Sequence, residues 1–149
     1  MELTTLTALS PLDGRYRRTG DKLAPYFSEF GLIRYRVKVE IEWLKALAYE
    51  PSIKEVPPFS DETIAELDAL VANFSLADAE AVKTHEKVTN HDVKAVEYFL
   101  KERLATSPEF TPASLEFIHF ACTSEDITNL AHALMLYAAC TDVIEPTLE

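Results

Sequence analysis

Residues 30–47, FGLIRYRVKVEIEWLKAL, form the stretch that decides the fold. Its apolar residues recur in steps of three and four, at Phe30, Ile33, Val37, Ile41, Leu44 and Leu47. Steps of this size place side chains on one face of an α-helix, because the helix turns once in about 3.6 residues. The pattern therefore predicts a long helix that buries one face and ends before Pro51, since proline disrupts a helix interior.

The next part of the chain carries the same periodicity in shorter segments, each opened by a residue that can cap a helix. We expect one helix to begin after Ser60 and a short one, capped by Ser75, to cover 77–82. Asn90 is expected to cap a further helix, which should stop near Ser107 because a proline follows.

Two more helix starts are expected toward the end of the sequence. Thr111 precedes a proline, a cap and first-turn pair that predicts a helix. We expect this helix to hold Leu115, Ile118 and Phe120. Thr123 resembles the first residue of a capping box, and an apolar stripe follows it at Ile127, Leu130, Ala131, Leu134 and Ala138. The stripe's pattern is still running at Glu149, so we expect it to continue in a longer protein.

Glycine usage supports a fold made of helices. The chain has only three glycines, Gly14, Gly20 and Gly31, all within its first 31 residues, and proline is the main breaker afterwards. Tight β-hairpins usually need glycine or asparagine in their turns. The sequence therefore predicts an all-α fold.

Charge and composition narrow the classes of partner. The 149 residues include 25 Asp and Glu against 14 Lys and Arg, which gives a net charge of −11. Such a chain repels polyphosphate, so we expect no nucleic-acid partner. We expect no apolar run that spans a bilayer and no secretory signal, and hence a cytoplasmic protein without a membrane partner.

Cysteine and histidine spacing does not indicate a metal site. Cys122 and Cys140 lie among apolar residues without a Cys-x-x-Cys pattern, so we expect reduced, buried thiols. No histidine pair has His-Glu-x-x-His spacing, and we expect no metal ion or organic cofactor. Several histidines and aromatic residues are expected in the core, namely His119, His132, Trp43, Phe99, Phe117 and Phe120.

Three short polar runs stand out in this apolar chain: SPLDGRY at 10–16, TNHD at 89–92 and TSED at 123–126. Each lies in a turn or opens an expected helix, where free N–H groups and the helix dipole favour anions. Arginine can grip a phosphate or carboxylate with two parallel hydrogen bonds, and an imidazole can donate to an oxyanion. Each run taken alone also fits a solvated loop or an ordinary helix cap.

Taken together and in order, these runs resemble the adenylosuccinate lyase family of the fumarase/aspartase superfamily. The resemblance is carried by SPLDGRY at 10–16, TNHDVKAVEYFL at 89–100 and EFIHFACTSED at 116–126. It extends over nearly the whole chain, including VEIEWL at 39–44 and HALML at 132–136. It implies an N-terminal helical domain over 1–110 and the start of a central helix bundle over 111–149.

The resemblance also implies which residues bind substrate. Members eliminate fumarate from adenylosuccinate, giving AMP, and from the succinylated aminoimidazole carboxamide ribotide of purine synthesis. Arg15 and Tyr16 would contact the phosphate side of the nucleotide. Asn90, His91 and Asp92 would form a substrate-binding turn, and Thr123 with Ser124 would grip the succinyl part. The full-length form would be a homotetramer with active sites shared between subunits.

The family's acid and base lie in motifs that these 149 residues lack. Its general acid is a histidine in a Thr-His-Gly-type motif, and its general base is a serine in a Gly-Ser-Ser loop. His91 is the one local candidate for proton transfer, and we expect it to bind and orient substrate instead. The chain alone is therefore expected to be inactive. The alternatives are a helical interaction module and a fragment of another lyase of the superfamily.

Overall fold

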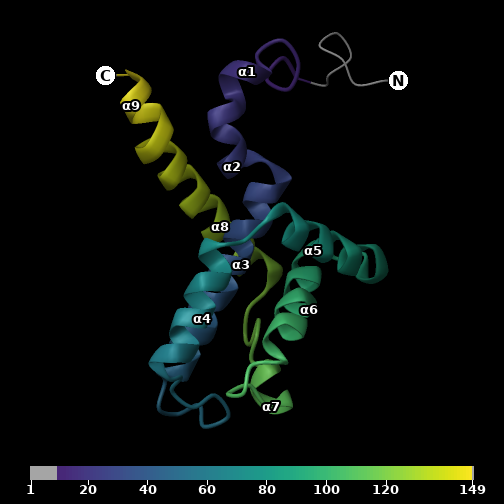
Figure 1. Ribbon diagram of the computed structural model, residues 1–149, viewed down its shortest axis with the longest axis vertical. Coiled ribbons are helices and arrows are strands. Elements are labelled where there is room, and N and C mark those ends of the chain that lie inside the picture. Colours follow the sequence, from purple (N-terminus) through teal and green to yellow (C-terminus); the bar gives the residue numbers. More distant parts are fainter. Residues whose placement is uncertain (1–9, 149) are drawn as a thin grey trace.

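A computed structural model describes residues 10–148, and in that range the regular elements are all helical (Figure 1). The helices are α1 (Arg17–Gly20), α2 (Ala24–Phe27), α3 (Glu29–Ala48), α4 (Asp61–Ala72), α5 (Leu76–Thr89), α6 (Asp92–Leu104), α7 (Pro112–Leu115), α8 (Ser124–Ala139) and α9 (Glu145–Leu148), with a 3₁₀ turn, η1 (Asp21–Leu23), and a π-helical segment, η2 (Cys140–Ile144). The predicted all-α class is confirmed.

Helix α3 lies at the centre of the molecule and contains the periodic stretch over residues 30–47. Ser28 caps it, accepting a hydrogen bond from the Gly31 N–H at 3.2 Å. The predicted face is buried from Ile33 to Leu47, and Phe30 packs partly buried against the same core. This burial removes large aliphatic side chains from water, which is the main source of stability for a helix in a protein.

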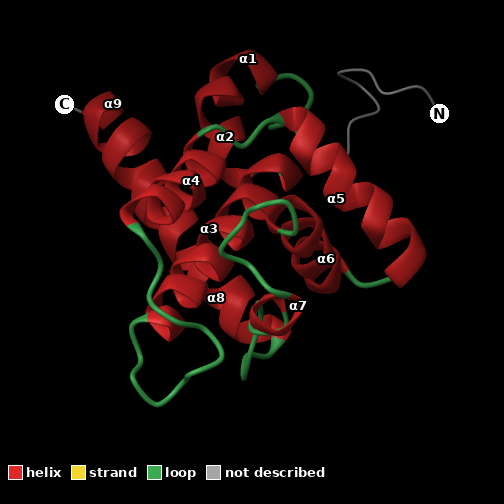
Figure 2. Ribbon diagram, turned by 60° about the horizontal axis from the view of Figure 1, so that its bottom comes forward, coloured by secondary structure: helices red, strands yellow, loops and turns green. Residues whose placement is uncertain are grey.

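Two apolar clusters lie on different sides of α3, and the helices that surround α3 are seen in Figure 2. The larger cluster joins α3 to α4, α5 and α6, with Leu67, Val82 and Leu100 fully buried in it. The smaller cluster joins α3 to α8 and to the start of α6, through Tyr35, Val39, Val93, Ile127, Ala131 and Met135. Because both sides of α3 are covered, this helix can hold the start of α6 and the start of α8 at once.

The connection between α5 and α6 differs from the prediction. Ser75 does cap α5 as expected, but the helix continues to Thr89 instead of ending near residue 82. Asn90 is the C-terminal cap of α5, with a left-handed φ of 49°, and His91 is the N-terminal cap of α6. Asparagine tolerates the left-handed region better than most residues, which lets α5 stop and α6 begin with only two residues between them.

The helix predicted after Thr111 is only one turn long. Thr111 caps α7 as expected, in a capping box with Ser114, yet α7 ends at Leu115 and turns follow. His119 and Ala121 in these turns have left-handed φ values of 65° and 58°, which a helix cannot contain. Phe120, expected in the core, is 44% exposed.

The apolar face of α8 is rotated from the predicted stripe. Its buried residues are Ile127, Ala131, Met135 and Ala139, whereas Leu130 is 56% exposed. His132 is also exposed, so its prediction as a core residue was wrong. The buried residues are spaced by four throughout, so α8 contacts α3 along a narrow strip. Only part of the wider predicted stripe is buried.

Helix α8 continues through η2 and α9 as one rod that extends away from the α4–α7 part of the molecule (Figure 1). The helix widens to π geometry over Cys140–Ile144, which ends two residues before Pro146, and this proline has no N–H to donate to the preceding turn. By length and composition Ser124–Leu148 could cross a membrane, so the expectation of no such apolar run was wrong on that measure. Core helices of soluble proteins have the same composition, and α8 packs along α3.

Replacing Gly31 with alanine is expected to lower the free energy of unfolding by about 1–3 kcal/mol. A β-carbon at Gly31 would lie 2.7 Å from the carbonyl carbon of Tyr26 and 2.8 Å from the carbonyl oxygen of Pro25. These are backbone atoms of α2, so relief requires α2 to move from α3. Urea denaturation followed by circular dichroism measures the change.

Gly20→Ala is the matched control. A β-carbon there meets its nearest atom, the carbonyl oxygen of Leu12, at 4.0 Å. This variant should be as stable as the parent or slightly more so, because alanine favours a helix over glycine. Equal stability of the two variants would show that α2 and α3 do not depend on this close approach.

Candidate functional site

The start of α8 is a helix N-terminus with a complete capping box. Thr123 donates its N–H to Asp126 Oδ2 at 2.7 Å, and its hydroxyl donates to the same oxygen at 2.8 Å. The N–H hydrogen bond from Thr123 lowers the pKa of Asp126. Because this hydroxyl is used in the cap, only the Ser124 hydroxyl stays available, together with the first N–H groups of the helix. The Thr123 hydroxyl is thus a cap group in this structure.

His91 lies at the start of α6 and faces Ser124. Its Nδ1 accepts a hydrogen bond from the Lys94 N–H at 3.1 Å, so in the neutral ring the proton is on Nε2. That Nε2 lies 3.4 Å from Ser124 Oγ, although the two residues are 33 positions apart. The structure therefore joins two of the three polar runs through an exposed N–H donor and a hydroxyl.

Asp92 occupies the free donors of α6 itself. Its Oδ1 accepts from the Val93 N–H at 2.9 Å, and its Oδ2 pairs with Arg36 Nη1 at 2.8 Å. Partial burial raises the pKa of Asp92, but the Arg36 charge and the Val93 N–H outweigh it and hold that pKa below its usual value. Asp92 therefore fixes the start of α6, while the donors left for an anion come from the His91 ring and from α8.

Asn90 and Thr89 shape the turn that carries His91. The Thr89 hydroxyl donates to the His91 carbonyl oxygen at 3.1 Å and accepts from the His91 N–H at 3.3 Å. Asn90 stands between them, exposed and left-handed. These hydrogen bonds orient the backbone of His91, while the Lys94 N–H orients its ring.

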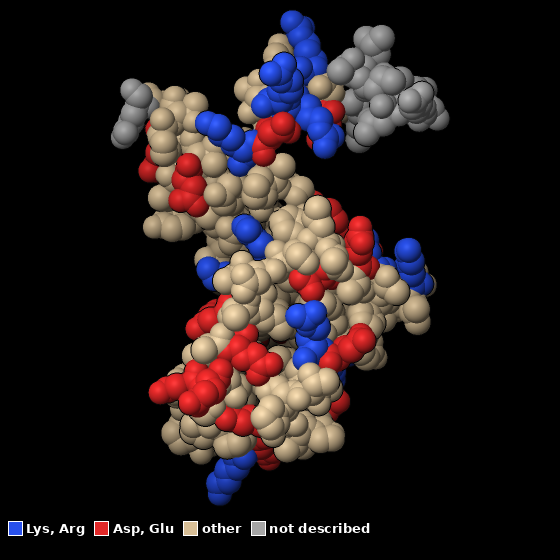
Figure 3. Space-filling view, viewed as in Figure 1, with Lys and Arg blue, Asp and Glu red and all other residues tan. Residues whose placement is uncertain are grey.

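Arg15 and Tyr16 lie apart from this pair. The turn over residues 10–16 is closed by a hydrogen bond from the Tyr16 N–H to the Pro11 carbonyl oxygen at 2.9 Å, and the Arg15 guanidinium stacks 5.2 Å from the centre of the Tyr16 ring. Basic side chains gather over this end of the molecule, next to α1 (Figure 3). Within residues 10–148, no hydrogen bond or ion pair joins Arg15 or Tyr16 to His91 or Ser124.

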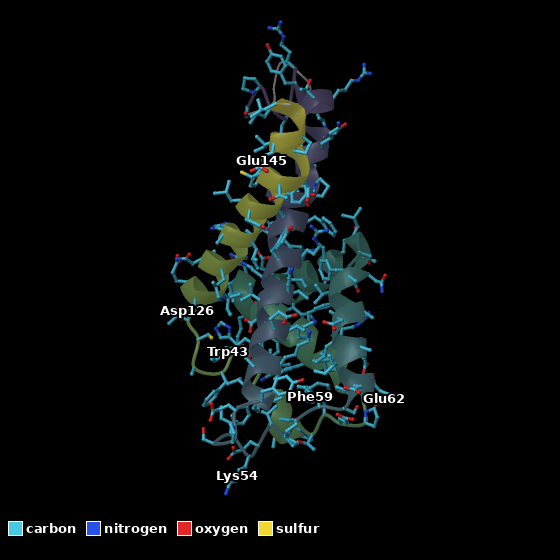
Figure 4. All side chains as sticks on the ribbon, turned by 90° about the vertical axis from the view of Figure 1, so that its left-hand side faces the viewer. Trp43, Lys54, Phe59, Glu62, Asp126 and Glu145 are labelled. Carbon is cyan, nitrogen blue, oxygen red and sulfur yellow. The ribbon has the colours of Figure 1, made fainter. Side chains whose placement is uncertain are left out.

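Three residues of α3 that were not among the predicted site residues also hold the site. Arg36 and Glu40 are buried, and Trp43 donates its Nε1–H to the Phe120 carbonyl oxygen at 2.8 Å. Figure 4 shows Trp43 and Asp126 on the same side of the molecule, with Asp126 in the first turn of α8. Arg36, Glu40 and Trp43 follow at steps of four and three, which places them on one face of α3.

In the described part of the chain, no group of three or more His, Cys, Asp or Glu side chains is placed to hold a metal ion. Cys122 and Cys140 are free thiols and are half-buried instead of fully buried. Burial, together with the charges of Glu40 and Asp126, raises the pKa of the Cys122 thiol. Its thiolate is therefore disfavoured, which argues against a nucleophilic role.

Comparison with known proteins identifies the family of this chain. The sequence model of a family described as Lyase matches residues 14–149. The adenylosuccinate lyase of Escherichia coli (strain K12) is 59% identical over 146 residues, which is 98% of this chain and 32% of that protein. Those of Haemophilus influenzae and Vibrio cholerae are 60% and 57% identical over 98% and 99% of this chain. The chain spans about a third of the length of these relatives, and the resemblance drawn from the sequence is confirmed. The chain belongs to the lyase family.

Proposed function

We propose that this chain is the N-terminal part of a longer protein, of the same length as those relatives, and we refer to that protein as the whole protein. The whole protein eliminates fumarate from adenylosuccinate and from the succinylated aminoimidazole carboxamide ribotide. The carrying observation is the approach of His91 Nε2 to Ser124 Oγ at the starts of α6 and α8. The sequence identity to adenylosuccinate lyases supports the choice of substrate.

The chemistry fits the donors at this site. Elimination of fumarate needs a base that removes a proton next to a carboxylate, donors that stabilise the negative charge that develops, and an acid for the departing nitrogen. His91 Nε2 lies 3.4 Å from Ser124 Oγ, and Ser124 is the first residue of α8, where N–H groups lack partners within the helix. These donors would hold a carboxylate of the succinyl group, while the acid and base come from other parts of the whole protein.

We further propose that Arg15 and Tyr16 bind the phosphate of the nucleotide. In a homotetramer whose sites lie between subunits, Arg15 and Tyr16 of one subunit would lie beside the His91–Ser124 pair of another subunit. Within one chain, no described contact joins these two pairs. We also propose that the chain divides into the domains 1–110 and 111–149, that the protein is cytoplasmic and that it uses no cofactor.

The direct test is fumarate release from adenylosuccinate by the purified whole protein, followed by absorbance. Continuous release that stops when adenylosuccinate is exhausted would support the proposal, and no release would overturn it. Calorimetric titration of the 149-residue chain separates the remaining alternative. A helical interaction module would ignore adenylosuccinate and AMP, whereas the proposed site should bind at least one of them weakly.

Replacing Arg15 with alanine is expected to raise the KM of the whole protein by about one to two orders of magnitude. The change removes charge-assisted hydrogen bonds to a phosphate, which contribute about 1.5–3 kcal/mol. Arg15→Lys should also be impaired, because an ammonium lacks the planar fork of a guanidinium. Steady-state kinetics measures the effect. Arg18→Ala, an exposed arginine in α1, is the control, and parental kinetics in Arg15→Ala would refute the phosphate assignment.

A further inference from the structure

One face of α3 holds both helix starts that form the candidate site. Arg36 pairs with Asp92 at the start of α6, at 2.8 Å. Glu40 and Trp43, one and two turns further along, contact the turn that leads into α8, through His119 and the Phe120 carbonyl oxygen. The distance between His91 and Ser124 therefore depends on contacts that both converge on a single helix.

Glu40 is the most unusual of these residues. It has no solvent exposure, its Oε1 lies 2.6 Å from His119 Nδ1, and its Oε2 has no hydrogen-bond partner. Burial raises the pKa of Glu40, and the hydrogen bond and charge of His119 oppose that rise. Glu97 on α6 and Cys122 are the other titratable groups near this carboxylate. A buried, half-satisfied carboxyl group is costly, so an apolar residue would serve the core better.

The turn that Glu40 holds is strained. His119 and Ala121 both have left-handed φ values, and neither is a residue that favours this region as glycine does. Such a conformation is costly for a residue with a β-carbon and persists only where the surroundings hold it. Glu40 through His119, and Trp43 through Phe120, are the described α3 contacts that do so. Thr123 and Ser124 follow this turn directly.

We propose that Glu40 is a positioning residue of the candidate site, which acts through His119 to fix the 119–122 turn and so to place Ser124 opposite His91. The proposal rests on the proposed function, because it assigns Glu40 a share in substrate binding. Glu40 touches no substrate itself. The contact between its Oε1 and His119 Nδ1 selects one ring orientation and one backbone conformation for the turn.

The test compares Glu40→Gln with Glu42→Gln in the whole protein. Glutamine keeps the volume of Glu40 and removes its charge, while Glu42 is exposed on the same helix and serves as the matched control. We expect kcat/KM for adenylosuccinate to fall by about tenfold to a hundredfold in Glu40→Gln, as displacements of about 1 Å at a site produce. Glu42→Gln should stay within twofold of the parent.

A second readout separates positioning from stability. The imidazole ¹⁵N resonances of His119 and the amide resonance of Ser124 should shift in folded Glu40→Gln and stay unchanged in Glu42→Gln. A folded Glu40→Gln with parental kcat/KM and unshifted Ser124 would overturn the role of Glu40. A parent protein that releases no fumarate would instead overturn the proposed function, so the two failures are distinguishable.

His119 variants decide the matter if Glu40→Gln does not fold. Asparagine tolerates the left-handed region and its side-chain amide can donate to Glu40, whereas alanine cannot donate. We expect His119→Ala to lose kcat/KM by at least about tenfold and His119→Asn to recover part of that loss. Parental kinetics in His119→Ala, or no recovery in His119→Asn, would contradict positioning through this turn.

Discussion

Replacing His91 with asparagine in the whole protein is expected to lower kcat by about two to three orders of magnitude, the usual effect of removing one donor from a developing oxyanion. His91 caps α6 through Nδ1, which leaves Nε2–H directed toward Ser124. Asparagine is a good N-cap but too short to present a donor at the position of Nε2. The change to asparagine therefore removes the donor at Nε2 and keeps the N-cap of α6.

His91→Ala is the companion variant. It loses the donor and the cap together, so it should match His91→Asn in turnover and be less stable by about 1 kcal/mol. Stopped-flow fumarate release gives kcat, and far-UV circular dichroism with urea gives the stability. If His91→Asn kept parental turnover, His91 would belong to the scaffold alone.

The 149-residue chain by itself is expected to release no fumarate from adenylosuccinate. His91 and Ser124 supply donors, but donors without an acid and a base leave most of the barrier in place. The comparison is the whole protein at equal molar concentration, assayed in the same buffer. Turnover by a verified, uncontaminated 149-residue chain would show that proton transfer residues lie within it.

The same preparation is expected to self-associate. The rod formed by α8, η2 and α9 leaves several large apolar side chains exposed, among them Leu130, Leu136, Tyr137 and Leu148. Exposed apolar surface of this kind favours association with another copy. Light scattering over a range of concentrations measures it, and Leu136→Glu should reduce the mass. A monomer at high concentration would show that this surface stays solvated.

Local signals in the sequence predicted much of the fold. Helix starts depend on one residue and its nearest neighbours, so Ser60, Ser75, Thr111 and Thr123 were all identified as caps. The period of α3 was also sufficient, because both its length and its buried face follow from spacing alone.

The differences arise where distant residues decide the outcome. Nothing near His119 in the sequence indicates a left-handed backbone, because the contacts that hold it come from α3. Asn90 was assigned as a cap of the wrong helix, since asparagine is common both before and after helices. The roles of Arg36 and Glu40 depend on partners more than 50 residues away, which a local pattern does not contain.

The left-handed Asn90 has a consequence for how this chain can vary in length. Only residues 90 and 91 separate α5 from α6, and one of them is the histidine of the site. A residue inserted there would either displace α5 relative to α6 or move His91 from the N-cap position of α6. The connection over 49–60, between α3 and α4, is far from His91 in sequence and can lengthen at little entropic cost. Insertions and deletions among homologues should therefore accumulate in the longer connection and be absent at Asn90.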